Sequence, residues 1–222
     1  MLTAKNLIHH LTTKPWEATG ELPLLQRHSN QQNKRAALKV FLGVVTVLFM
    51  LLIVAYAGRM AYEDWRPAPQ IRLMWANTLV LFLGSLGLEL AQYAVRRGQH
   101  KLLLRSLLAA GLCTLLFLMG QAQAWRELGA LVYFDVTNPA IAFFYLITGL
   151  HGLHLLGGLV VWGQTLVRLW GGFELEKVRH SVELCTLYWH FLLLVWLVLF
   201  GLLFTGNNLD ELMIICGIKG RT

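Results

Sequence analysis

Long apolar runs separated by short polar segments dominate the chain. No lysine, arginine, aspartate or glutamate lies inside the intervals 39–59, 105–126, 135–168 and 183–210. A fifth apolar run, 72–96, is interrupted only by Glu89. A helix needs roughly 20 apolar residues to cross about 30 Å of hydrocarbon. The pattern therefore predicts transmembrane helices near 38–58, 72–95, 103–124, 139–168 and 183–206.

The polar segments between these runs are short, and short connections make consecutive helices antiparallel neighbours. We therefore expect an all-α membrane protein of five transmembrane helices in an up-down bundle. The predicted domain limits are a polar cytoplasmic N-terminal tail over 1–36, a transmembrane domain over 37–206 and a short external C-terminal tail over 207–222. Glycines at 149, 152, 157 and 158 predict that the fourth helix packs against protein.

Lysine and arginine are unevenly distributed between the two predicted sides of the membrane. Most of the 19 such residues fall in the N-terminal segment and in the second and fourth connections. Basic residues are retained on the cytoplasmic side in short loops and tails. The N-terminus is therefore predicted to be cytoplasmic and the C-terminus external.

The composition excludes several classes of protein. A content of 56% hydrophobic and 14% charged residues, with a mean hydropathy of +0.56, lies outside the usual range for soluble domains. The net charge of +7 is interpreted as a topology signal and an attraction to membrane lipids, not as a nucleic-acid-binding surface. Three separated cysteines give neither a zinc motif nor a disulfide framework.

Ionisable residues inside a bilayer are costly, so each needs a partner or a function. Glu89 lies within the second predicted span, and Glu183 at the cytoplasmic start of the fifth. One interpretation gives both residues a proton-handling role. The competing interpretation is structural: a hydrogen bond to another helix for Glu89, and a favourable interaction with the helix dipole for Glu183.

Three histidines lie within the last two predicted spans. His151 and His154 are three residues apart on one helix face, and His190 lies at a comparable depth. We expect them to form a structural polar cluster with Glu183 and Tyr188. Metal or haem ligation is the alternative, and would make the chain a b-type cytochrome; an autonomous transporter is a further alternative. Catalytic triads, phosphate-binding glycine loops and paired carboxylates are absent from the sequence.

Two motifs in the last two spans resemble a known family. The segment His151-Gly-Leu-His154, followed by Gly157-Gly158, precedes Tyr188-Trp-His-Phe191 and then Trp196. In this order they resemble the cytochrome c oxidase subunit III family, in its short five-helix bacterial form. Weaker similarity extends over roughly 40–205, and Pro15-Trp16 resembles the N-terminal Pro-Trp of that family.

The resemblance implies an accessory subunit III of a haem-copper terminal oxidase in aerobic respiration. It implies no redox centre and no metal in this chain, with haem and copper in partner subunits. The implied partners are the catalytic subunit I, subunit II and membrane lipids, including bound phospholipid. The implied location is the bacterial inner membrane, where the chain would support assembly, stability and proton uptake. A component of a nitric oxide reductase or quinol oxidase is the alternative.

Three positions depart from the pattern of that family. Acidic residues common in the family are replaced by apolar ones near Val45, at Ala124 and at Leu193. Any role of those carboxylates therefore cannot be transferred to this chain.

Overall fold

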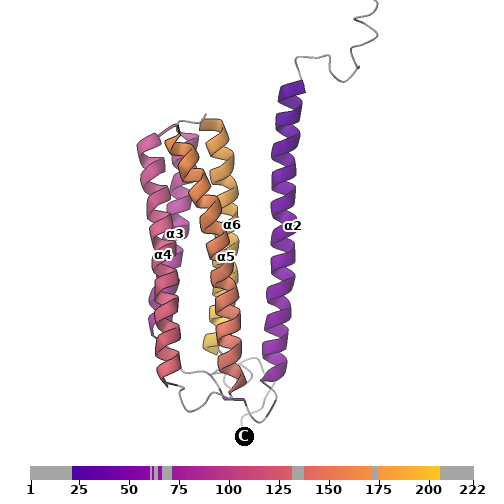
Figure 1. The fold of residues 1–222 in the computed structure, drawn as a ribbon, viewed down its shortest axis with the longest axis vertical. Coiled ribbons are helices and arrows are strands. Elements are labelled where there is room, and N and C mark those ends of the chain that lie inside the picture. The colour runs from indigo at the N-terminus through magenta and orange to yellow at the C-terminus, as the bar shows by residue number, and fades with distance from the viewer. Residues whose placement is uncertain are drawn as a thin grey trace, which may run out of the picture. The chain divides into compact units, whose positions relative to one another are not determined.

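The computed structural model describes residues 22–60, 62, 65–66, 72–131, 138–171 and 175–205. Side chains are described from Gln32 in the first helix and over 178–204 in the last. Throughout these residues the regular structure is helical, and five helices are long and apolar enough to span a membrane (Figure 1). The predicted fold class, an all-α five-helix membrane protein, is confirmed. The helices are α2 (Leu22–Arg59), α3 (Leu73–Arg96), α4 (His100–Leu131), α5 (Pro139–Trp170) and α6 (Leu175–Thr205).

Several helices extend beyond the predicted spans. Helix α2 begins at Leu22, within the segment assigned to a polar tail, and α6 begins at Leu175, ahead of the predicted start at 183. Hydropathy marks only the part of a helix that suits lipid, whereas the helix continues until a turn residue stops it. No glycine or proline lies in 24–40 or 175–183. Between α3 and α4 the chain does turn, at Gly98, whose φ of +69° lies in the left-handed region.

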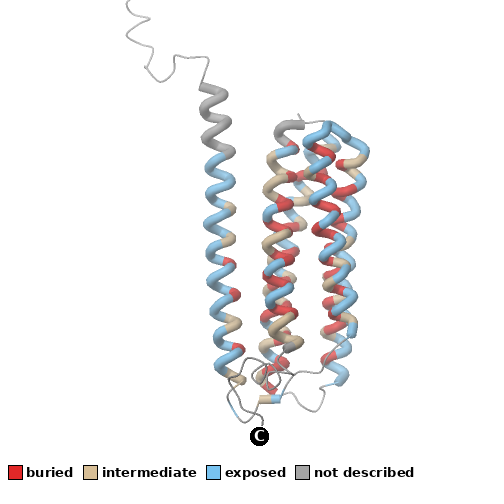
Figure 2. The backbone as a smooth tube through the Cα atoms, turned by 180° about the vertical axis from the view of Figure 1, so that it is seen from behind, coloured by how far each residue is buried: buried red, intermediate tan, exposed pale blue. Residues whose placement is uncertain are grey.

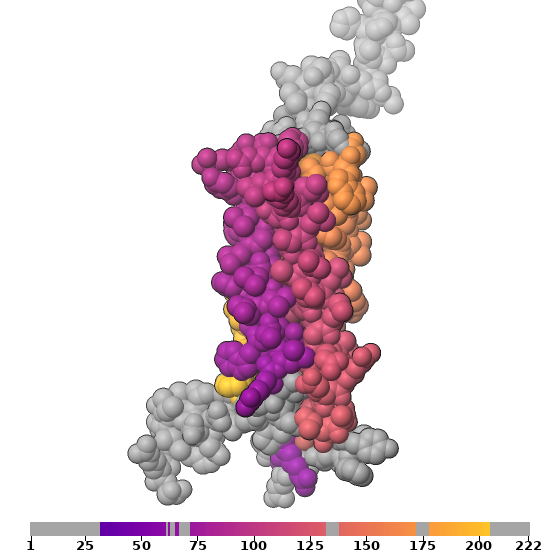
Figure 3. Space-filling view, turned by 90° about the vertical axis from the view of Figure 1, so that its left-hand side faces the viewer, coloured from indigo at the N-terminus to yellow at the C-terminus, as the bar shows by residue number. Residues whose placement is uncertain are grey.

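The chain divides into two compact units, Met1–Val40 and Phe41–Thr222. The described part of the first unit is the polar N-terminal portion of α2, from Leu22 to Val40. The second unit contains the rest of α2 and the helices α3 to α6. In this unit α3 packs against α4 and α6, and α5 packs against α4 and α6. Figure 3 shows α3 and α4 side by side along their lengths.

Large apolar and aromatic side chains fill the interior between α3, α4, α5 and α6. Phe117, Trp189 and Trp196 are among the largest fully buried residues. The outward sides of the helices are exposed (Figure 2), yet they too are largely apolar, as at Met119 and Leu153. Apolar residues both inside and outside are typical of helices surrounded by lipid.

Glycine allows close approach at several helix contacts. A Cβ atom at Gly158 of α5 would lie 2.8 Å from the Tyr188 ring and 2.9 Å from the Trp189 ring of α6. Gly149 and Gly152 also face side chains of α4, whereas no atom lies within 4 Å of a Cβ placed at Gly157. Of the four glycines expected to line an interface, Gly158 is the one that the packing requires.

Candidate functional site: polar contacts within the membrane spans

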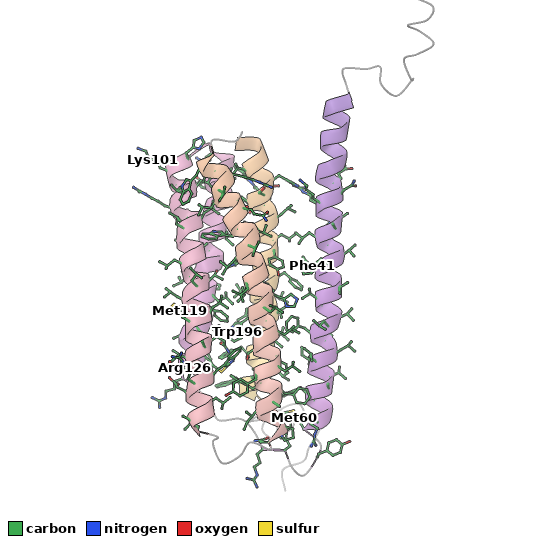
Figure 4. All side chains as sticks on the ribbon, in the orientation of Figure 1. Phe41, Met60, Lys101, Met119, Arg126 and Trp196 are labelled. Atoms are coloured by element: carbon green, nitrogen blue, oxygen red, sulfur yellow. The ribbon has the colours of Figure 1, made fainter. Side chains whose placement is uncertain are left out.

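Tryptophan side chains bridge the helices through their indole N–H groups. Three of these groups donate to threonine hydroxyls on a neighbouring helix, each over 3.0 Å: Trp125 to Thr148, Trp189 to Thr114, and Trp196 to Thr78. In a fourth contact Trp162 donates to the main-chain oxygen of Leu107 over 2.9 Å. Figure 4 shows Trp196 between the helices. These bonds join α3 to α6, α4 to α6 and α4 to α5.

Threonine suits this position because its hydroxyl can donate and accept at once. Each of the three hydroxyls also donates to a carbonyl four residues earlier in its own helix: Thr78 to Met74, Thr114 to Ala110 and Thr148 to Phe144. The remaining lone pairs then accept the indole proton. In each of the three pairs the indole N–H and the threonine hydroxyl are therefore satisfied without water, as a hydrocarbon environment requires.

Sequence reasoning missed these pairs. The available signal was the presence of threonine and tryptophan in otherwise apolar spans. Spacing along the chain does not indicate which tryptophan meets which threonine, since partners such as Trp196 and Thr78 are 118 residues apart. The pairing follows only from the packing of the helices.

His151 is completely buried at the centre of the bundle. Neither ring nitrogen has a hydrogen-bond partner among the described residues. Three aromatic rings surround the imidazole, with centroid distances of 5.1 Å to Trp196, 5.9 Å to Phe117 and 6.4 Å to Phe49. The Phe117 ring is nearly perpendicular to it, the edge-to-face arrangement that aromatic pairs prefer. The side chain packs as an aromatic residue.

His154 lies close to Leu150 and Tyr188. Its Nδ1 is 2.7 Å from the main-chain oxygen of Leu150. A carbonyl can only accept, so Nδ1 carries the proton. The Tyr188 hydroxyl donates to the main-chain oxygen of His154 over 2.9 Å. Tyr188 and His154 therefore meet through the backbone of α5 and not through the imidazole.

Glu183 lies near the start of α6 and forms an ion pair within that helix. Its Oε1 is 3.3 Å from Nε of Arg179, four residues earlier. The Arg179 side chain is 52% exposed and that of Glu183 17%. An exposed pair at this spacing contributes a few tenths of a kcal/mol, about 0.3–0.5.

Among the residues that the structure describes, Glu89 of α3 and His190 of α6 form a second acidic contact within the spans. Glu89 Oε1 lies 3.4 Å from Nε2 of His190, and Nδ1 of the same ring is 2.8 Å from the main-chain oxygen of Thr186. Because that carbonyl can only accept, Nδ1 donates to it, and Nε2 is the ring atom that faces the Glu89 carboxyl group.

The five residues of the predicted polar cluster therefore do not share one set of contacts, and His151 has no hydrogen-bond partner among the described residues. His154 and Tyr188 are in contact, whereas His190 pairs with Glu89 and Glu183 with Arg179. The role of the set as a unit remains a prediction. The Glu89–His190 contact was not foreseen, since nothing in the sequence says that α3 and α6 are neighbours at this depth.

Three positions at which acidic residues are common in the family that the sequence resembles are buried in the apolar core of this chain. Val45 is 2% exposed, Ala124 0% and Leu193 8%. Val45 belongs to a buried cluster with Phe49, Ile147 and Leu199. A carboxylate at such a site would need a partner, so the apolar residues suit their surroundings.

No group of three or more histidine, cysteine, aspartate or glutamate residues that could hold a metal ion occurs in the described part of the chain. Cys113 and Cys185, both inside described helices, are free thiols.

The family model and the similar proteins that match this chain agree on one family. The family model for cytochrome c oxidase subunit III matches residues 65–206. Cytochrome c oxidase subunit 3 of a Synechocystis species is 29% identical over 87% of this chain and 82% of its own length. A probable cytochrome c oxidase subunit 3 of Mycobacterium bovis is 33% identical over 74% of this chain and 84% of its own. A heme-copper oxidase subunit I+III of Aeropyrum pernix is 26% identical over 76% of this chain and 22% of its own. Since the family model covers more than half of the sequence, the chain belongs to the cytochrome c oxidase subunit III family.

Proposed function

We propose that this chain is the accessory subunit III of a haem-copper terminal oxidase in aerobic respiratory electron transport. The match of the family model to 65–206, a region that includes four of the five membrane-spanning helices, carries the proposal. The proposed location is the bacterial inner membrane, with a cytoplasmic N-terminus. The bias of lysine and arginine supports that orientation.

The chain associates with the catalytic subunit I and with subunit II, and haem and copper belong to those partners. The printed name of the Aeropyrum relative, subunit I+III, supports the association with subunit I, because that protein joins the two in one chain. The contribution of this chain is to assembly, to stability during turnover and to retention of phospholipid. It carries no redox centre.

Other functions receive less support. The relatives described above are named as cytochrome c oxidase or heme-copper oxidase subunits, which does not favour a nitric oxide reductase or quinol oxidase component. None of those relatives is named as a transporter or a b-type cytochrome.

Support of proton uptake is the most specific part of the proposal. Glu183 lies near the end of α6 that is cytoplasmic in the proposed orientation, and Glu89 lies 3.4 Å from His190. Glu183→Gln is expected to slow steady-state oxygen reduction at high pH, where protons are scarce, while the chain stays in the complex. Unchanged rates across the pH range would remove Glu183 from proton uptake.

The experiment that tests the function is purification of the tagged chain in mild detergent. We expect subunits I and II to copurify, together with haem absorbance and oxygen consumption. The chain expressed without these partners should show no haem absorbance. Stoichiometric haem in the chain alone, or copurification with no haem-containing subunit, would contradict the proposal.

A further inference from the structure

An acidic contact lies exposed on the outer surface of the bundle, within a membrane span. In the Glu89–His190 pair the Glu89 side chain is 55% exposed and that of His190 39%. Glu89 precedes the end of α3 at Arg96 by seven residues, which is about 10 Å along a helix axis. The pair therefore lies at hydrocarbon depth and is not covered by α3 or α6.

Lipid tails cannot satisfy this contact. Moving an ionisable group into the bilayer interior is costly, and residues of this kind are normally turned toward protein or water. Internal pairing reduces the cost without removing it, because the carboxyl group keeps unused acceptor sites. A protein partner with a suitable polar group would remove the remaining cost.

The chemistry that the pair still offers defines the partner. His190 directs Nδ1 to the main-chain oxygen of Thr186 and Nε2 to Glu89, so neither ring nitrogen is left to donate outward. A carboxylate only accepts hydrogen bonds, so the unused positions of Glu89 are acceptors. The partner must therefore supply a donor. A second copy of this chain would place acceptors against acceptors, which argues against self-association through this surface.

The surroundings of the pair are apolar and exposed. Leu86 and Tyr93 lie one helical turn to either side of Glu89 and are 45% and 48% exposed, and Leu194, one turn beyond His190, is 60% exposed. We call Leu86, Glu89, Tyr93, His190 and Leu194 the Glu-His face. By contrast, the outward residues Leu112, Leu116 and Met119 of α4 are all apolar, which suits lipid.

We propose that the Glu-His face of α3 and α6 is the surface on which a transmembrane helix of the catalytic subunit docks, with a hydrogen-bond donor placed against Glu89. This inference rests on the proposed function and adds the face and the chemistry of the contact. The helix of the partner covers the polar pair and packs against the leucines on either side of it.

Photo-crosslinking tests the docking face in the assembled complex. p-Benzoylphenylalanine is introduced at Leu86 or Leu194 within the face, and at Leu112 or Met119 of α4 as controls; Figure 4 shows Met119 pointing away from the bundle. We expect adducts with the catalytic subunit from the two face positions and not from the controls. Adducts with that subunit only from α4, or adducts between two copies of this chain from the face, would overturn the proposal.

A pair of variants tests the chemistry. The double variant Glu89→Leu with His190→Leu removes the polar atoms that lipid disfavours. The free subunit is therefore stabilised relative to the complex. We expect retention of the catalytic subunit in mild detergent to fall roughly tenfold at equal membrane levels of the chain. Glu89→Gln keeps an outward acceptor and should retain the partner. Equal retention by the double variant would overturn the role of the pair.

The two proposals can fail separately. Absence of any haem-containing subunit from the purified wild-type complex would contradict the function itself. Normal copurification with adducts only from α4 would leave the function intact and contradict only the docking face.

Discussion

A buried indole N–H in a lipid-exposed bundle needs an acceptor, and the threonines of α3, α4 and α5 provide it. Interhelical hydrogen bonds in membrane proteins contribute about 0.6 kcal/mol on average and up to about 1.7 kcal/mol. Each bond is therefore a modest contribution to stability. Its larger effect is on specificity, because a helix shifted by one residue would leave donors such as those of Trp189 and Trp196 unpaired.

Thr114→Val tests a single pair. Valine has nearly the shape of threonine but cannot accept, so the buried Trp189 donor loses its partner. We expect about 1 kcal/mol of destabilisation, measured by unfolding in mixed micelles, and near wild-type stability for Thr114→Ser. Thr46→Val is the matched control, because the exposed Thr46 hydroxyl donates to Leu42 of its own helix. Equal losses for Thr114→Val and Thr46→Val would rule out the interhelical bond as a source of stability.

His151 presents the opposite situation, a buried polar ring without a hydrogen-bond partner among the described residues. Removing both polar atoms from such a site can be nearly neutral, because no partner is left behind. We expect His151→Leu to change the stability by less than about 1 kcal/mol, the loss of ring contacts being offset by the removal of unsatisfied nitrogens. A loss of several kcal/mol in the same unfolding assay would show that the imidazole has a partner.

At the scale of helices, residue patterns predicted that the five helices exist and roughly where they lie, but not how long they are or which helices contact one another. Charge-free intervals located four of the five spans and an apolar run interrupted only by Glu89 located the fifth, because lipid tolerates few ionised groups. The same patterns placed the start of α6 at 183, whereas the helix begins at Leu175, since Glu176, Lys177 and Arg179 suit the headgroup region as well as a helix. Which helix faces meet is a property of three-dimensional packing, so pairs such as Glu89 and His190 could not be read from spacing.

Adjacent glycines of α5 provide a matched test of helix packing. Gly158→Ala would place a methyl group within 3 Å of the Tyr188 and Trp189 rings, and should cost about 1–3 kcal/mol. Gly157→Ala meets no atom within 4 Å and should be neutral or stabilising by up to about 1 kcal/mol through helix propensity. The two variants are compared by thermal unfolding in detergent. Equal stability would contradict the close contact between α5 and α6.

The orientation of the whole molecule can be tested independently of its partners. With a cytoplasmic N-terminus, the turn around Gln99 between α3 and α4 lies inside the cell. In a background without the native cysteines, a cysteine at Gln99 should react with a membrane-impermeant maleimide only in inverted vesicles. A cysteine at Asn208, which lies outside the described residues, should react in whole cells. The reverse pattern would invert the proposed topology.

We propose that the chain supports a redox complex without taking part in electron transfer. The most direct measurement compares the haem spectrum and the oxygen-reduction time course of the complex before and after removal of this chain, and again after it is added back. After removal we expect an unchanged haem content and a similar initial rate, with activity that decays faster during turnover and is protected by adding the chain back. Loss of haem absorbance in proportion to the chain removed would contradict it.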